Sequence, residues 1–124
     1  MRLATFAFEG LLPRANVLLR SHWATRSKLK ADLIGGLTLL RNDLTAEGKF
    51  RCAGKNERRN VYITLKKHTL SDDDNAYAQC KSLLDAMIKT GLIYDDGPRF
   101  LHLEVKQEKI PKGEKPTVVI SVSW

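Results

Sequence analysis

Aspartates gather in two short turns of this sequence, and their chemistry is that of a divalent-metal site. Asp72 and Asp74 lie two residues apart in Ser-Asp-Asp-Asp-Asn, and Asp95 and Asp96 are adjacent in Asp-Asp-Gly-Pro. Carboxylates held at one spot repel one another, and a bound cation relieves that repulsion. All-oxygen ligation suits Mg²⁺ or Mn²⁺. On a phosphodiester, such an ion polarises the phosphoryl group, orients water and neutralises charge on the leaving oxygen.

The two acidic turns flank a helix, and we expect this strand–helix–turn unit to bring them close together in space. Asp72 and Asp74 would point the same way in an extended turn. The competing interpretation is purely structural, because an Asp-rich turn before a helix is commonly an N-cap. Asp-Asp-Gly-Pro is likewise a common turn sequence.

A helical wheel adds a cation to the acidic side of that helix. At 100° per residue, Asp74, Ala78, Lys81 and Asp85 lie within about 60° of one another, away from the apolar stripe. Lys81 could therefore reach back to a phosphate and stabilise developing negative charge. It could equally pair with Asp85 at a spacing of four residues.

Composition and charge indicate a globular protein with a polyanionic partner. The 124 residues fit a single domain spanning 1–124, and the formal net charge of +7 favours nucleic acid. No stretch is long and apolar enough to span a membrane. The N-terminus lacks the apolar run of a signal peptide, so we expect a cytoplasmic, nucleoid-associated protein. Cys52 and Cys80 show no zinc-ligand spacing and are expected to be reduced thiols.

Hydrophobic periodicity predicts the elements that position the acidic turns. Alternating residues predict strands over residues 2–8, 60–68, 99–108 and 117–124, with a short strand near Phe50–Ala53. Helical spacing predicts one helix from about Ser21, with Ser21 as its N-cap, and a second over residues 76–91. The order is β-α-β-α-β-β, which indicates an α+β fold with a mixed sheet of about four strands and two main helices.

The motifs, taken in order, resemble the RusA family of Holliday-junction resolvases. That family's pattern is D-x-D-N, then a helix with a lysine and an Asp-Ala or Asp-Gly pair, then a Gly-hydrophobic segment ending in Asp-Asp. The corresponding residues here are Asp72-Asp73-Asp74-Asn75, Lys81, Asp85-Ala86 and Gly91-Leu92-Ile93-Tyr94-Asp95-Asp96. The N-terminal segments L-P-R-A-N and S-H-W-A-T-R-S-K-L-K are also similar. Lys81 follows Asn75 by six residues, whereas some family members have three.

The resemblance implies a homodimer that binds four-way DNA junctions and introduces paired nicks with Mg²⁺. Asp72, Asp74 and Asp96 would be the metal carboxylates with Asp95 beside them, and Lys81 would be the catalytic lysine. The extra Asp73 leaves open which of the three consecutive aspartates ligate the metal.

A basic surface should then hold the DNA backbone, because four-way junctions offer phosphates and shape rather than a base code. The residues predicted to contact the backbone are Arg14, Arg20, Arg26, Lys28, Lys30, Arg58 and Arg59. Two other functions stay open: a non-catalytic module that binds branched DNA, and a small interaction protein whose acidic turns are only caps. Mg²⁺-dependent nicking, binding without cleavage, and neither activity would distinguish the three.

Overall fold

A computed structural model describes residues 2–10 and 23–124 of the protein, and it confirms the α+β class with a mixed sheet. The elements, in chain order, are β1 (Leu3–Glu9), α2 (Trp23–Ala46), β2 (Arg59–Lys67), α3 (Asp73–Gln79), α4 (Lys81–Thr90), β3 (Leu101–Lys109) and β4 (Thr117–Ser123). The predicted cap Ser21 lies outside the described residues. Within the described part of the chain, no helix is long and apolar enough to cross a membrane.

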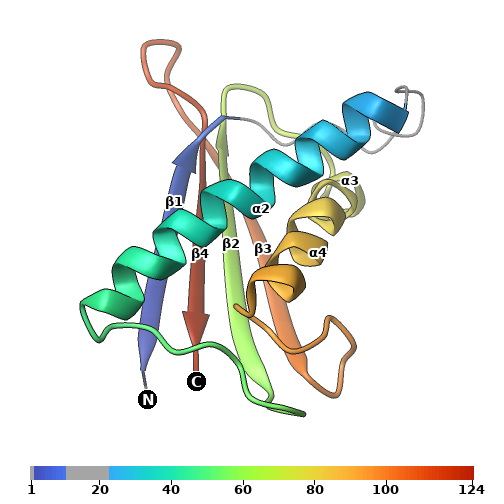
Figure 1. Ribbon diagram of the computed structural model, residues 1–124. Helices are drawn as coiled ribbons and strands as arrows, with labels where there is room; N and C mark the ends of the chain where they lie inside the picture. The colour runs from blue at the N-terminus through green and yellow to red at the C-terminus, as the bar shows by residue number, and fades with distance from the viewer. Residues whose placement is uncertain (1, 11–22) are drawn as a thin grey trace.

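The four strands form one sheet in the order β1-β4-β2-β3. β4 runs antiparallel to β1 and β2, whereas β2 and β3 are parallel, with Arg59 opposite Leu101 and Lys67 opposite Lys109. The parallel pair needs a crossover connection, which α3 and α4 supply. We call the sheet end at which β2 finishes and α3 begins the α3 end, and the opposite one the Trp124 end (Figure 1).

The helices cover one face of the sheet, and the core lies between them and the strands (Figure 1). Alternation along each strand sends every second side chain into this core. At the centres of β2 and β4, the inward-facing side chains are all apolar. These buried side chains are Val61, Ile63, Leu65, Val118, Ile120 and Val122. Leu33 and Leu37 of α2 complete the core from the helix side, at the predicted helical spacing.

Two predicted elements differ from the structure. The second helix is interrupted at Cys80, where the amide bonds to Tyr77 O at 3.0 Å and a new helix starts at Lys81. The strand expected near Phe50–Ala53 does not form. Phe50 is nevertheless buried, and its ring packs edge-on against Phe6 and Trp124, so side-chain packing anchors this segment without a strand ladder.

Candidate functional site

The first acidic turn follows β2 and begins α3. Asp72 is the N-cap of α3, and its carboxylate accepts hydrogen bonds from the Asn75 amide at 2.9 Å and from Asn75 Nδ2 at 3.2 Å. Asp73 and Asp74 occupy the first helical turn and are exposed. The capping role expected of such a sequence is therefore filled by Asp72, while the carboxylates of Asp73 and Asp74 face solvent.

A buried polar cluster fixes the base of this turn, and sequence reasoning did not single it out. Lys67 Nζ donates to Ser71 Oγ at 3.1 Å and to Gln79 Oε1 at 3.0 Å. Gln107 of β3 accepts from the Ser71 amide at 2.9 Å and donates to Ser71 O at 2.7 Å. These bonds link β2, β3 and α3 to the turn at Ser71, which is the residue before Asp72. The alternation of β2 could have predicted that Lys67 is buried, because this residue falls on the inward-facing positions of the strand.

Cys80 lies at the junction of α3 and α4 and is fully buried. Burial raises the pKa of its thiol to about 12, although the nearby Lys67 ammonium opposes this shift. The thiol is therefore protonated at neutral pH, and a buried, protonated thiol is a poor nucleophile.

Lys81 is the first residue of α4 and is exposed. The helical wheel that placed it beside Asp74 does not apply, because the rotation of 100° per residue is interrupted at Cys80. The alternative pairing with Asp85 is also absent, since no ion pair joins these two residues in the described chain. Lys81 is thus an unpaired cation close in sequence to the first acidic turn.

The second acidic turn follows α4, which ends at Gly91 in a left-handed conformation with φ of 79°. Leu92 and Ile93 are buried and anchor the segment that follows. Asp95 Oδ1 accepts a hydrogen bond from the Asp96 amide at 2.9 Å, and Asp96 is exposed. The turn then leads directly into β3, with Leu101 N bonded to Gly97 O at 3.0 Å.

The two acidic turns lie at opposite ends of the sheet, so the prediction that they meet within one chain is wrong. Asp72–Asp74 follow the last residue of β2, at the α3 end, whereas Asp95–Asp96 precede the first residue of β3, at the Trp124 end. A nine-residue strand separates these ends by about 26 Å. Within residues 2–10 and 23–124, no three His, Cys, Asp or Glu side chains form a group that could hold a metal ion. The cause is the parallel pairing of β2 and β3, because a parallel crossover carries the chain back across the sheet before the next strand begins.

The aspartates of both turns are nevertheless uncompensated. No ion pair with a described residue involves the aspartates of these turns, Asp72, Asp73, Asp74, Asp95 and Asp96. Each turn therefore presents negative charge that an external cation can neutralise.

The predicted DNA-contact residues fall into three groups. Lys28, Lys30 and Arg58 are exposed, as a backbone contact requires. Arg14 and Arg20 lie outside the described residues, and Arg26 is placed only as a member of α2.

Arg59 is a correction, because its guanidinium is buried and cannot reach a phosphate. It is 1% exposed and donates to Glu57 Oε2 at 2.6 Å, Leu92 O at 3.1 Å and Arg51 O at 2.7 Å. Its charge also lies 4.6 Å from the centre of the Trp124 ring. As the first residue of β2, Arg59 joins the loop before that strand to the segment that carries Asp95.

Glu57, the carboxylate partner of Arg59, should make folding stability depend on pH. Burial raises the pKa of this carboxyl, but hydrogen bonds from Arg51, Arg59 and the Gly54 amide outweigh burial and lower the pKa from 4.5 to about 2. A depressed folded-state pKa stabilises the protein above pH 4.5, and that contribution is lost as pH falls toward 2. We expect the free energy of unfolding to fall by about 2 kcal/mol between pH 6 and about pH 3 through this group. Urea titrations at several pH values measure this change in the free energy of unfolding.

Glu57→Gln is the matched variant for this prediction, because it keeps an acceptor but removes the charge. It should be less stable than wild type near neutral pH and should lose that part of the pH dependence. Equal pH profiles for the two proteins would contradict the assignment.

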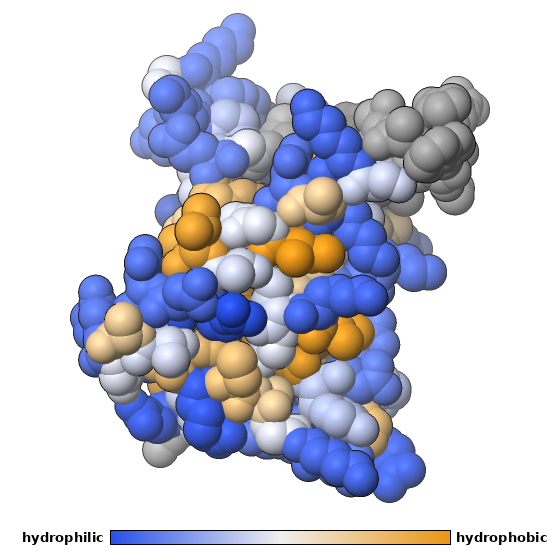
Figure 2. Space-filling model, viewed as in Figure 1, coloured by the Kyte–Doolittle hydropathy of each residue, from blue (hydrophilic) through white to orange (hydrophobic). Residues whose placement is uncertain are grey.

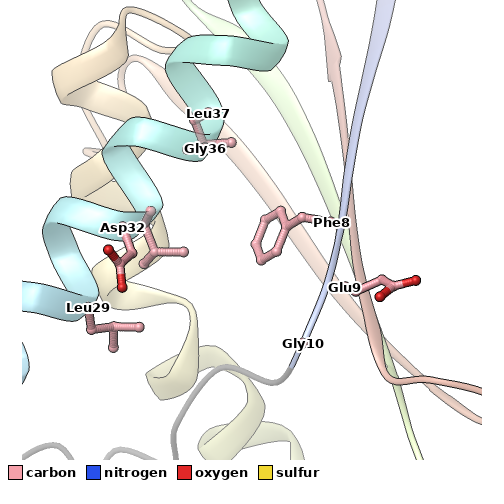
Figure 3. A pocket seen from close by; sticks show the side chains of 8 residues that line it. Phe8, Glu9, Gly10, Leu29, Asp32, Gly36 and Leu37 are labelled. Carbon is pink, nitrogen blue, oxygen red and sulfur yellow. The ribbon is translucent and has the colours of Figure 1, made fainter.

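A cavity of about 280 Å³ lies between β1 and α2, and none of its described lining residues belongs to either acidic turn (Figure 3). Phe8 and Leu29 face it from opposite sides, while the Glu9 carboxylate points away. Gly36 lines the cavity without filling it, since a Cβ there would meet no atom within 4 Å. Its described lining is mainly apolar, with Asp32 as the carboxylate nearest the space, so it lacks the paired groups that phosphodiester chemistry needs.

Comparison with known proteins adds no relative: no family model matches the chain, and a search of curated proteins finds no match. The function is therefore inferred from this chain's own residues. These are the two acidic turns, which have no cationic partner in the described chain, and the exposed cations Lys28, Lys30, Arg58 and Lys81.

Proposed function

We propose that the protein is a Mg²⁺-dependent endonuclease that resolves four-way DNA junctions by paired nicks, in DNA recombination and repair. The observation that carries the proposal is the pair of uncompensated acidic turns in a chain of net charge +7. Negative charge exposed at two points of a basic protein fits sites that receive a cation while the remaining surface attracts DNA. The order of the motifs, which resembles the RusA family, supports the same reaction.

The positions of the two turns give the proposed site a specific form: each metal centre is built from two chains. In a two-fold symmetric dimer, residue i of one protomer contacts residue j of its partner, and the reverse contact follows by symmetry. Two protomers packed in opposite directions would bring the Asp72–Asp74 turn of one beside the Asp95–Asp96 turn of the other. One dimer would then carry two equivalent centres, which suits paired nicks in a two-fold symmetric junction.

The carboxylates fit Mg²⁺ by chemistry, because ionised Asp offers only oxygen acceptors and Mg²⁺ prefers oxygen ligands; Mn²⁺ would suit the same set. Asp72 and Asp74 of one protomer, with Asp96 and Asp95 of its partner, would hold the ion. A bound Mg²⁺ would supply polarisation of the phosphoryl group and neutralise charge on the leaving oxygen. Asp72 keeps free lone pairs for this role, although Asn75 occupies part of its carboxylate.

The remaining groups position the DNA. Lys81, exposed and unpaired at the start of α4, would contact the phosphate and stabilise negative charge that develops in the transition state. Lys28, Lys30 and Arg58 would contact the backbone away from the reacting bond, and Arg14, Arg20 and Arg26 remain predictions of the same kind.

A second function, non-catalytic binding of branched DNA, is favoured by one observation. Within the described part of a single chain, no group of ligands is assembled for a metal ion. A protein that never brought its acidic turns together would keep the basic surface and bind junctions without cutting them.

A labelled four-way junction incubated with the protein and Mg²⁺ distinguishes these functions. The proposal expects symmetric paired nicks that disappear when EDTA removes the metal and return when Mg²⁺ is restored. Tight junction binding without nicks in Mg²⁺ or Mn²⁺ would overturn the nuclease and favour the binding module.

A further inference from the structure

The hairpin between β3 and β4 projects beyond the sheet at the α3 end, as Figure 1 shows. Several hydrogen bonds hold its base and tip in place. Ile110 N bonds to Lys67 O at 3.0 Å, and His68 Nε2 lies 2.7 Å from Glu114 O. Two prolines, Pro111 and Pro116, further restrict the backbone. The hairpin is thus attached to the segment that leads from β2 into the first acidic turn.

The charge of this hairpin is basic and accessible. Lys109, at the end of β3, and Lys112 and Lys115 in the turn are exposed, against two exposed glutamates, Glu108 and Glu114. Lys109 and Lys112 form no ion pair with any described residue. Lys115 approaches Glu9 at 3.7 Å, but both side chains are largely exposed, and such surface pairs are weak. All three ammonium groups can therefore bind another anion. Figure 2 shows the hairpin as a hydrophilic projection.

The features of the hairpin indicate the kind of partner it fits. It carries no aromatic side chain on which a base could stack, so base recognition is not supported. Lysine acts as a flexible point charge, which suits phosphate oxygens spaced along a backbone. A stiff arm that presents spaced lysines can follow such a backbone with little loss of conformational freedom.

We propose that the β3–β4 hairpin is a DNA-backbone contact that seats one duplex arm next to the Asp72–Asp74 turn through Lys109, Lys112 and Lys115. This inference rests on the proposed function for the identity of the polyanion, but it does not require cleavage. His68 sets the direction of the arm through its bond to Glu114 O. The lysines of the hairpin and the acidic turn then act on neighbouring stretches of the same duplex.

The test compares Lys112→Ala/Lys115→Ala with a charge-matched control, Lys49→Ala/Lys89→Ala. The control lysines are also exposed, and they lie near the Trp124 end, after α2 and at the end of α4. Binding to a fluorescent four-way junction and to a linear duplex is measured by anisotropy in EDTA at several salt concentrations. Each lost phosphate contact should lower the slope of log affinity against log salt by about one, so the hairpin variant should lose about two. The control should keep the wild-type slope.

Each outcome supports or overturns the inference. Equal slopes for the hairpin variant and wild type, or equal losses in both double variants, would overturn it, since net charge would then explain the binding. Loss of affinity for the junction only, with linear-duplex binding unchanged, would support a contact with one arm at the branch. Hairpin-dependent binding without nicking in Mg²⁺ would support the inference while overturning the nuclease. Nicking by wild type, together with DNA binding that does not depend on the hairpin lysines, would support the nuclease while overturning the inference.

Discussion

Asp74→Asn is expected to reduce nicking of a four-way junction by about 10²–10³-fold, which corresponds to about 3–4 kcal/mol of lost transition-state stabilisation. The carboxylate of Asp74 is exposed in the first turn of α3 and has no cationic partner in the described chain. Asparagine keeps its shape and removes its charge, so a metal ion would lose a ligand while the fold stays intact. Loss of a negative charge near a helix N-terminus costs only about 0.5 kcal/mol of stability.

Asp43→Asn is the matched control, because Asp43 is also exposed but belongs to α2. It should nick at the wild-type rate. Junction binding measured in EDTA should be unchanged or slightly stronger for Asp74→Asn, since a negative charge near DNA has been removed. Wild-type nicking by Asp74→Asn would show that this carboxylate takes no part in the reaction. Equal losses in both variants would indicate a general effect of charge.

The acidic turns were predictable as exposed turns because local chemistry defines them. Asp72 is a good N-cap, and Gly97-Pro98 cannot continue a helix or strand, so both segments had to lie at element ends. Their separation was not predicted. A strand, a helix and a strand in sequence allow the second strand to pair in parallel, and parallel pairing puts the two connecting turns at opposite sheet ends.

Charged residues were the least predictable part of the candidate site. Arg59 and Arg58 are adjacent and chemically identical, yet strand alternation turns only Arg59 inward, where Glu57 and two carbonyl oxygens receive it. Lys67 is turned inward in the same way. A pattern of single residue types cannot show which cations find buried partners, because some of those partners, such as Leu92 O for Arg59 and Gln79 for Lys67, lie further along the chain in other elements.

The helix break at Cys80 also depends on packing against other elements, which the local residue pattern does not show. Apolar spacing continues through Leu83 and Met87, so periodicity alone predicts one helix, and Cys80 itself favours no break. In the folded chain, α3 must follow the turn that the Lys67 cluster fixes, while α4 packs against α2. Two separate packing requirements therefore meet at Cys80, where one helix ends and the next begins.

Mixing Asp74→Asn protein with Asp96→Asn protein is expected to restore nicking that neither variant shows alone. If each centre takes Asp74 from one protomer and Asp96 from its partner, a mixed dimer has one centre with both substitutions and one with neither. After random exchange of protomers, about half of the dimers are mixed, and each mixed dimer has one intact centre. About a quarter of all centres in the mixture are therefore intact. The products should be single nicks rather than paired ones, because only one centre in a mixed dimer is active.

The control is a mixture of Asp74→Asn with Asp72→Asn. Both substitutions lie in the same turn, so every centre of the mixed dimer still carries one of them, and nicking should not return. Exchange is verified by tagging one variant and recovering the mixed dimer before the junction assay. Restoration by the first mixture and not the second would require metal centres shared between chains. Failure of both mixtures, with active wild type, variants inactive alone and verified exchange, would mean that each centre draws its aspartates from one chain. Nicking by Asp96→Asn alone would instead mean that this aspartate has no catalytic role.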